Sequence, residues 1–436
     1  MASNQEVGGS IPSGRATTDM AETAATPAPR TDCIIVGGGP AGMVLGLLLA
    51  RRGARVRMLE RHADFARDFR GDTIHPSTLE MLDRIGIADE LHRLQHGKLR
   101  VMRFVTPQAT WPLLRFDGLK TRFPYIMIAP QARFLDLLQA HARRYPHFTL
   151  TFDAYVQELV QENGAVVGVR YKDGKGAVHE VRAPLTVAAD GRGSRLAKLA
   201  GLEPEGQSPE MDVVWLRLPK KESDADDEGA MYTSDGQFMV MFERDREWQA
   251  GYVIAKGGYK RLYEAGIAQL QQNVARLAPW LADRVAAIDD WTKAHMLTVR
   301  ADRLPLWHKP GLLCIGDAAH AMSPVGGVGI NYAIGDAVEA ANVLSEKLRE
   351  GRSIEEADLA EVQRRREPAV RLIQRIQGVI QQRVVGESLR HKKQFVPPWP
   401  LRLILKTPVL RNIPARMVAF GPHPYRLERA DEHAPA

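Results

Sequence analysis

The chain has 436 residues, of which 44% are hydrophobic and 25% are charged, and its formal net charge is +7 at pH 7. A chain of this length can bury two or three substantial cores, and these proportions are ordinary for a globular protein. Composition therefore excludes a fibre, a collagen and a wholly disordered chain. No nucleic-acid-binding motif accompanies the positive charge, so no nucleic-acid partner is expected.

The beginning of the chain and the cysteines point to a cytoplasmic protein. Residues 1–30 are rich in small residues and proline without core-forming periodicity, which predicts a disordered leader. The leader lacks the pattern of a signal peptide, and no apolar run reaches the roughly 18 residues of a membrane span. Cys33 and Cys314 lie in apolar runs without a CxxC partner, so neither a metal site nor a disulfide is expected.

A strand, a glycine-rich turn, a helix and a second strand are predicted over residues 31–61. The turn reads GGGPAG and fits GxGxxG, in which the first glycine permits a tight turn, the second admits a pyrophosphate and the third lets helix pack on strand. An acid ends the second strand, where it can accept hydrogen bonds from ribose hydroxyls and would repel the 2′-phosphate of NADP. The candidate dinucleotide-binding residues are Gly37, Gly39, Pro40, Ala41, Gly42, Glu60 and Arg61.

The following segments alternate between helix and strand patterns. A helix is predicted from about Pro76, a strand, turn and helix over residues 126–144, and a hairpin or meander over residues 151–181. A further buried strand ends on Asp190-Gly191. Residues 211–258 alternate polar and apolar side chains, which predicts a mostly antiparallel sheet without its own phosphate loop.

The stretch GDAAHAMSPVGGVGIN, residues 316–331, follows the apolar run LLCI and is poor in large side chains. Long helical patterns then cover residues 332–349 and 355–389. A resemblance to a known family indicates what packs against this backbone, which carries few large side chains.

Three separated motifs carry that resemblance: GGGPAG near the start, Asp190-Gly191 in the middle and Gly316-Asp317 near the end. In this order they resemble the single-component FAD-dependent aromatic hydroxylases, the broad family of para-hydroxybenzoate hydroxylase and the ubiquinone-biosynthesis hydroxylases. The resemblance runs over residues 31–350. It implies noncovalently bound FAD, with NADPH or NADH as a transient co-substrate and O2 as the oxidant.

The resemblance also implies the fold, an α/β protein with a Rossmann-like FAD-binding domain, an inserted mostly antiparallel β-sheet substrate domain and a helical C-terminal region. The expected FAD-binding domain is discontinuous and comprises residues 31–98, 122–205 and 296–350. The expected substrate domain comprises residues 99–121 and 206–295, and the helical, basic C-terminal region residues 351–436.

The third motif is expected to surround the flavin. The resemblance implies that Asp317 accepts hydrogen bonds from ribityl hydroxyls, that the glycines let the backbone pass close to the ring, and that the helix beginning near Ile330 directs its N–H groups at the flavin. Arg70 and Arg133 are expected at the pyrophosphate region, with a structural salt bridge as the alternative for each. Asp190 is expected to organise this region. Beyond the first motif, the implied FAD-binding residues are Arg70, Gln131, Arg133, Val156, Asp190, Gly316, Asp317, Pro324, Gly327, Gly329, Ile330 and Asn331.

Two positions depart from the family pattern, and no catalytic residue is assigned. Relatives often have glutamine where Val328 stands, which weakens the inference of a para-hydroxybenzoate-like substrate, and arginine where Ala197 stands, which leaves the nicotinamide contact open. His75 and His320 lie beside predicted cofactor segments, but the sequence identifies no partner for either.

The implied activity is hydroxylation of an aromatic or lipophilic small molecule through a C4a-hydroperoxyflavin. Only one complete GxGxxG unit with its acid is present, which favours transient binding of the nicotinamide. Two alternatives stay open, an FAD-dependent reductase of an isoprenoid or quinone-like substrate and a non-catalytic FAD-binding redox sensor. A flavin halogenase is disfavoured because the sequence contains no WxWxIP-type segment.

Residues 396–420 interleave apolar and basic side chains, with prolines that prevent one long helix. This pattern suits a surface that contacts a membrane peripherally. A cap packed on the FAD-binding domain is the alternative, and it is favoured because most apolar segments of soluble enzymes are buried.

Overall fold

The computed structural model describes residues 30–66, 73–206, 209–225, 228–244, 246–382, 407 and 410–428. Within this part of the chain, residues from Thr31 onward form one compact unit by their contacts. The domain boundaries expected from the sequence stay a prediction, because the contacts do not divide this unit further.

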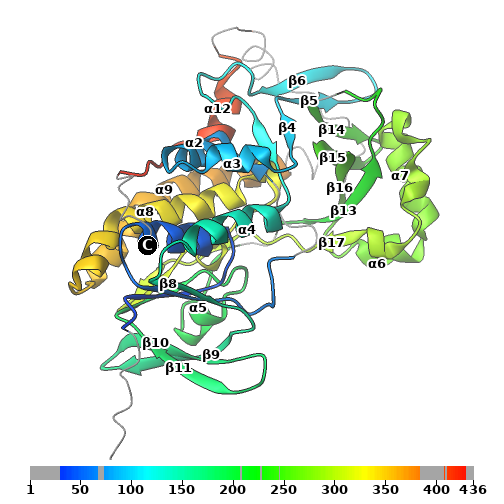
Figure 1. Cartoon of the computed structure of the whole chain (residues 1–436). Helices are drawn as coiled ribbons and strands as arrows, with labels where there is room; N and C mark the ends of the chain where they lie inside the picture. The colour runs from blue at the N-terminus through cyan, green and yellow to red at the C-terminus, as the bar shows by residue number, and fades with distance from the viewer. Residues whose placement is uncertain are drawn as a thin grey trace, which may run out of the picture. The chain divides into compact units, whose positions relative to one another are not determined.

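A six-stranded sheet carries the glycine-rich turn (Figure 1). Its strands are β1 (Cys33–Val36), β2 (Val56–Leu59), β8 (Phe148–Thr151), β12 (Leu185–Ala188), β19 (His308–Lys309) and β20 (Leu312–Cys314). Their order is β19-β20-β12-β1-β2-β8, and every neighbouring pair is parallel except β19 with β20. Strands β1, β12 and β20 are buried throughout, as expected for a parallel sheet covered on both faces.

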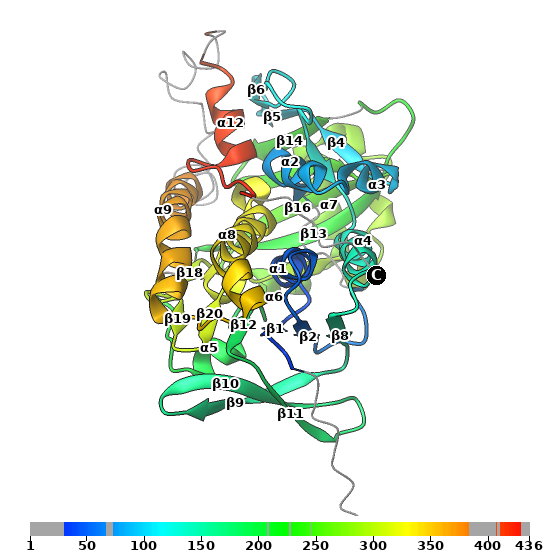
Figure 2. The same cartoon turned by 60° about the vertical axis from the view of Figure 1, so that its left-hand side comes forward.

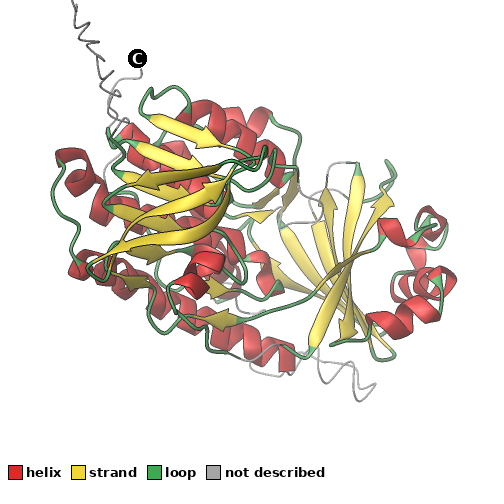
Figure 3. Ribbon diagram, turned by 90° about the horizontal axis from the view of Figure 1, so that it is seen from below, coloured by secondary structure: helices red, strands yellow, loops and turns green. Residues whose placement is uncertain are grey.

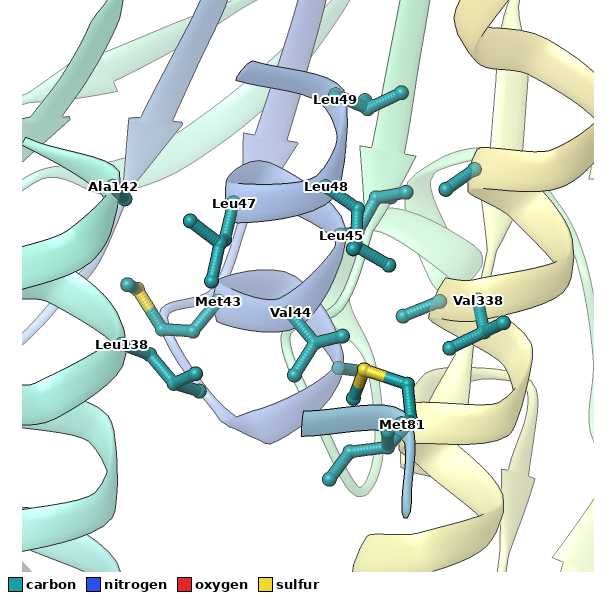
Figure 4. Close-up of a cluster of buried hydrophobic side chains, with 14 of the residues drawn as sticks. Met43, Val44, Leu45, Leu47, Leu48, Leu49, Met81, Leu138, Ala142 and Val338 are labelled. Carbon is teal, nitrogen blue, oxygen red and sulfur yellow. The ribbon is translucent and has the colours of Figure 1, made fainter. Parts of the chain in front are cut away.

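Helices cover one face of this sheet. They include α1 (Pro40–Arg51), α4 (Gln131–Ala142) and α8 (Gly329–Glu350), and α2 (Pro76–Arg84) packs on α8. Helix α1 lies between α4 and α8, and its side chains Met43 and Val44 belong to the same buried cluster as Leu138 of α4 and Val338 of α8 (Figure 4). Burial on nearly every side explains why α1 is apolar around its circumference.

A three-stranded meander lies on the other face of the parallel sheet, below it in Figure 2. Its strands are β9 (Tyr155–Glu162), β10 (Ala165–Lys172) and β11 (Val178–Arg182), followed along the chain by α5 (Arg195–Leu199). Val156 and Val169 pack in one cluster with Ile34 of β1, so the alternating pattern in this segment reflects one buried and one exposed face.

A second large sheet has seven strands, and helices pack on its outer face (Figure 3). Its strands are β5 (Val101–Val105), β6 (Thr110–Arg115), β13 (Met211–Pro219), β14 (Glu228–Ser234), β15 (Gln237–Arg244), β16 (Glu247–Ala255) and β17 (His295–Leu297). Their order is β17-β13-β16-β15-β14-β5-β6, and only β14 and β5 pair in parallel. The mostly antiparallel sheet expected from residues 211–258 is thus present, completed by two strands from an earlier part of the chain.

The two faces of this sheet have different partners. On the outer face, α7 (Ile267–Leu277) places Leu270 and Val274 in one cluster with Met239 and Ala250, and the short helix α6 (Tyr259–Glu264) precedes it. On the inner face, Trp215, Met231 and Val240 are only half-buried. A partly open apolar face is therefore available on one side of the sheet.

Smaller elements complete the described part. A three-stranded sheet joins β3 (Thr73–Ile74), β7 (Ile126–Ile128) and β4 (Gly97–Leu99), and β18 (Asp302–Arg303) pairs with β21 (His320–Ala321). The other helices are α3 (Ala88–Arg93), α9 (Glu356–Ile380) and α12 (Ile413–Phe420). The helix expected over residues 355–389 is present as α9, which ends at Ile380. Residues 383–389 lie outside the described part.

Helix α12 is the described portion of the C-terminal apolar and basic segment. Its residues Ala415 and Ala419 are buried against Phe116 and Phe242, whereas Ile413 is half exposed. Helix α12 is therefore packed on the protein, but against Phe116 and Phe242 of the expected substrate domain instead of the expected FAD-binding domain. Residues 396–406 and 408–409 lie outside the described part. Among the helices described, none has the length and apolar character needed to cross a bilayer.

Candidate functional site

In the glycine-rich turn after β1, the first and third glycines of the motif pack closely against backbone and the second faces open space. A Cβ atom on Gly37, whose φ is +108°, would lie 2.2 Å from the carbonyl oxygen of Ala189, and a Cβ on Gly42 would lie 2.0 Å from that of Gly37. A Cβ on Gly39 would meet no atom within 4 Å. The first and third glycines are therefore required by the fold, and the second faces open space, at the position where the motif predicts a pyrophosphate.

The N-terminus of α1 opens onto the same space. The helix begins at Pro40 immediately after the extended Gly39, and no side chain caps it. Its first N–H groups have no partner within the helix, and the helix dipole is positive at this end. The geometry suits an anion such as the pyrophosphate of a dinucleotide.

Glu60 is buried at the end of β2, beside this turn. Its Oε2 accepts a hydrogen bond from the Gly38 N–H at 2.7 Å, and its Oε1 accepts one from the His62 N–H at 3.0 Å. A carboxylate can accept several hydrogen bonds, and this one lies at the strand end where the sequence predicts the ribose contact. Arg61 is exposed and its Nε lies 2.8 Å from Nε2 of His62, which places its side chain outside the buried part of the turn.

The Gly316-Asp317 segment meets the first motif directly. Gly316 has φ +60°, and a Cβ there would lie 3.2 Å from the Cβ of Ala41 in α1 and 3.0 Å from that of Ala333 in α8. The next residue, Asp317, accepts a hydrogen bond at 3.0 Å from Nε of Arg192, one residue after Gly191. The structure thus brings together parts of all three motifs that are far apart in the sequence.

Asp190, expected to organise this region, is hydrogen-bonded within its own segment. Its Oδ1 accepts the Ser194 hydroxyl at 2.5 Å, and its Oδ2 accepts the N–H groups of Arg195 at 2.7 Å and Leu196 at 3.2 Å, which caps α5. Burial raises the pKa of Asp190, and these hydrogen bonds oppose the rise. The carboxylate is engaged with its own segment, while the backbone at Ala189 and Asp190 packs against Gly37.

The glycine loop before α8 is held close to β3. Pro324 precedes a 3-10 turn over Val325–Gly327, and Gly327 has φ +62°. A Cβ on Gly327 would lie 2.8 Å from Oγ1 of Thr73, whose hydroxyl donates to the Gly327 carbonyl at 2.8 Å. The bare backbone predicted for a flat ring therefore also serves close packing against β3.

Helix α8 begins at Gly329, one residue before Ile330, where the sequence placed its start. Asn331, expected to face the flavin through its backbone, has a second role in its side chain. Its Oδ1 accepts the His75 N–H and the Thr78 hydroxyl, each at 2.8 Å, and its Nδ2 donates to the Thr73 carbonyl at 3.2 Å. Asn331 thus fastens α8 to α2, a role that no sequence signal indicated.

The remaining residues expected to contact FAD differ in how exposed they are. Arg133 is exposed on α4, and the described part of the chain gives it no ion pair, so the structural salt bridge proposed as its alternative has no support there. Gln131 is the half-buried first residue of α4. Val156 is buried in β9, two residues after Ala154, whose N–H donates to the Glu60 carbonyl at 2.9 Å. Arg70 lies outside the described residues.

The two histidines beside these segments face the protein interior. Nδ1 of His75 lies 2.8 Å from the Val418 carbonyl, and burial lowers the pKa of His75 to about 4. Nε2 of His320 lies 2.6 Å from Oδ2 of Asp336. Both side chains bind structural partners, which agrees with leaving the catalytic base unassigned.

Replacing Asp317 by alanine should weaken FAD binding about 10- to 150-fold, because a charge-assisted hydrogen bond to a ribityl hydroxyl contributes about 1.5 to 3 kcal/mol. Titration of apoprotein with FAD measures the change. The matched control is Arg192→Ala, which removes the arginine that donates to the carboxylate while leaving Asp317 in place. Equal and small effects of the two substitutions would contradict a direct role of Asp317 in FAD binding.

Comparison with known proteins agrees with this arrangement. The family model described as "FAD binding domain" matches residues 30–375. The chain is 33% identical to 6-methylpretetramide 4-monooxygenase of Streptomyces rimosus, over 91% of this chain and 94% of that protein. It is 28% identical to anhydrotetracycline monooxygenase of the same organism, over 71% of this chain, and spans 61% of that longer protein.

Among solved structures, the myxobacterial chondrochloren halogenase CndH superposes with a TM-score of 0.71 at 21% identity, over 90% of this chain and 98% of that chain. At this identity the likeness concerns the fold, which oxygenases and halogenases share. The match to the family over most of the chain, the relative at 33% identity and the assembled cofactor site lead to one conclusion. The chain belongs to the single-component FAD-dependent aromatic hydroxylases, and it is an FAD-dependent monooxygenase.

Proposed function

We propose that this monooxygenase hydroxylates a fused-ring aromatic phenol, with NADPH or NADH as the electron donor. Two relatives support the substrate class, because both are named for oxygenation of tetracyclic compounds and one is 33% identical over nearly the full length of both chains. The departure at Val328 agrees with a substrate unlike para-hydroxybenzoate.

One structural observation carries the proposal. Val325, in the glycine loop expected at the flavin, belongs to the same apolar cluster as Trp215 and Met231 on the inner face of the seven-stranded sheet. These side chains are half-buried and apolar. A flat apolar ring bound between the loop and the sheet would cover them and gain about 25 cal/mol for each Å² of apolar surface removed from water.

The protein residues contribute binding, orientation and exclusion of water. Glu60 and the N-terminus of α1 suit the ribose and pyrophosphate, and the N-terminus of α8 offers N–H groups and a positive dipole end near the glycine loop. When bound, FAD supplies the electron transfer from nicotinamide to O2 that makes an oxygen atom available. The apolar inner face would keep water away from the reacting ring.

FAD should be held without a covalent bond. Cys33 and Cys314 are fully buried, and burial raises the pKa of both thiols far above the ordinary range, so neither is a reactive nucleophile. Denaturing the yellow protein and passing it through a filter should therefore release all flavin into the filtrate. Flavin colour that stays with the unfolded chain would contradict this expectation.

Labelled oxygen gives the direct test of the proposed activity. Purified protein loaded with FAD is incubated with NADPH or NADH, ¹⁸O2 and a panel of phenols with one to four fused rings, and products are examined by mass spectrometry. We expect one ¹⁸O atom in the product of a fused-ring phenol and faster flavin reduction when that phenol is present. A reaction confined to single-ring phenols would refute the substrate class while leaving the monooxygenase intact.

The alternatives have distinct signatures in the same experiment. A reductase would consume nicotinamide and reduce a quinone-like compound without incorporating oxygen. A halogenase would require chloride or bromide and give a product heavier by a halogen atom. A redox sensor would show no sustained turnover with any compound of the panel.

A further inference from the structure

Asp336 lies at the centre of a buried hydrogen-bond network beneath the Gly316-Asp317 motif. The side chain is 0% exposed in α8. Its Oδ2 accepts the Gly316 N–H at 2.9 Å and lies 2.6 Å from Nε2 of His320, and its Oδ1 accepts Nε–H of Arg366 at 2.8 Å. One carboxylate therefore holds both ends of the segment from residue 316 to residue 320.

Arg366 of α9 balances this buried charge. The residue is 2% exposed, donates to the Tyr332 carbonyl at 3.3 Å, and lies over the rings of Tyr332 and Tyr425 at 5.6 and 5.5 Å. Burial alone would raise the pKa of Asp336, but His320 and Arg366 lower it below its usual value, so the carboxylate is ionised. A fully buried charge is tolerated only when it is paired and hydrogen-bonded, as here.

The network acts on backbone that the cofactor site requires. Gly316 sits between Ala41 at the start of α1 and Ala333 in α8, and it is followed by Asp317. Any rotation of the Gly316 peptide would change the gap at the N-terminus of α1 and the direction of the Asp317 side chain together. Asp336 holds that peptide through the Gly316 N–H.

We propose that Asp336 and Arg366 are positioning residues for FAD. They hold the backbone from Gly316 to His320 in the FAD-binding conformation before FAD is present. The inference depends on FAD binding by this family and is independent of the proposed substrate. It also assigns a role to one arginine of the helical, basic C-terminal region expected over residues 351–436.

Asparagine at position 336 is the sharpest substitution. Its amide oxygen can replace one carboxylate oxygen, but its NH2 group must then face a donor among Gly316, His320 and Arg366. For Asp336→Asn we expect an FAD Kd at least about 10-fold higher and a shifted visible absorbance of the bound flavin. Arg366→Lys keeps the positive charge but loses the planar guanidinium, and should show the same changes to a smaller extent.

The matched control is Glu361→Gln on the same helix. Glu361 accepts hydrogen bonds from Arg364 and Arg365 on the exposed side of α9, away from the network. This substitution should leave the Kd and the flavin spectrum unchanged. A folded Asp336→Asn protein with wild-type Kd and spectrum would overturn the proposal.

Hydrogen–deuterium exchange of the wild-type protein tests the proposal even if the variants do not fold. Hydrogen–deuterium exchange of the apoprotein should show slow exchange at the Gly316 amide, because its partner Asp336 is buried and present without FAD. Protection that appears only after FAD is added would mean that the cofactor itself orders this segment, and the proposal would fail.

Discussion

Gly37→Ala should abolish FAD binding and destabilise the apoprotein. The added Cβ would lie 2.2 Å from the Ala189 carbonyl oxygen and 2.9 Å from the Cα of Asp190, and the φ of +108° is one that L side chains rarely adopt. Such backbone strain alone costs about 1 to 3 kcal/mol. Because the clash is with backbone of a neighbouring strand end, relief requires β1 and β12 to move apart. Urea unfolding and FAD titration measure the two effects.

Gly39→Ala is the matched control in the same turn. Its Cβ would meet nothing within 4 Å, so the apoprotein should unfold at nearly the same urea concentration as the wild type. FAD affinity should still fall, because the methyl group would enter the space assigned to the pyrophosphate. If Gly39→Ala bound FAD normally, the cofactor would not pass close to this glycine.

His75 should give the unfolding free energy a pronounced acid dependence. Its pKa is lowered from 6.5 to about 4, chiefly by burial, and hydrogen bonds to the carbonyls of Val418 and Gly327 oppose this. Between pH 6.5 and about 4, His75 is therefore protonated in the unfolded chain and neutral in the folded chain. Stability should fall as the pH drops from 6.5 to about 4, by about 3 kcal/mol in total from this residue.

His75→Asn should flatten this dependence, since asparagine does not titrate and its Nδ2 can still donate to the Val418 carbonyl. Urea unfolding of apoprotein at several pH values between 4 and 7 gives the slope. An equal slope in the wild type and in His75→Asn would show that His75 titrates normally in the folded protein.

The sequence identified the elements whose patterns are local. The turn at Gly37, the acid at Glu60 and the buried strand before Asp190 were each predicted in place, because turn chemistry and hydrophobic periodicity depend on neighbours in the chain. Helix α2 and the meander of β9 to β11 were predicted for the same reason. The individual FAD contacts stay a prediction, although the structure brings parts of all three motifs together.

Contacts between distant segments could not be read in the same way. The side chain of Asn331 bonds residues of β3 and α2 more than 250 positions earlier, and nothing in the sequence near residue 331 specifies that partner. Asp336 and Arg366 were missed because a charged residue in a long helix is usually solvated. Their one signal was an aspartate within the apolar stretch NYAIGDAVEAA, where an exposed acid would be out of pattern.

The parallel pairing of β14 with β5 has a consequence for any attempt to isolate the substrate-side sheet. Residues 206–295 supply four of its strands in full, β13 to β16, but β14 is completed only by β5 and β6 from much earlier in the chain. An excised fragment of residues 206–295 would therefore expose the full edge of β14, a ready template for pairing with another copy. Fusing residues 99–121 to that fragment through a flexible linker would cover the edge, and it is this composite, rather than the contiguous piece, that should stay monomeric.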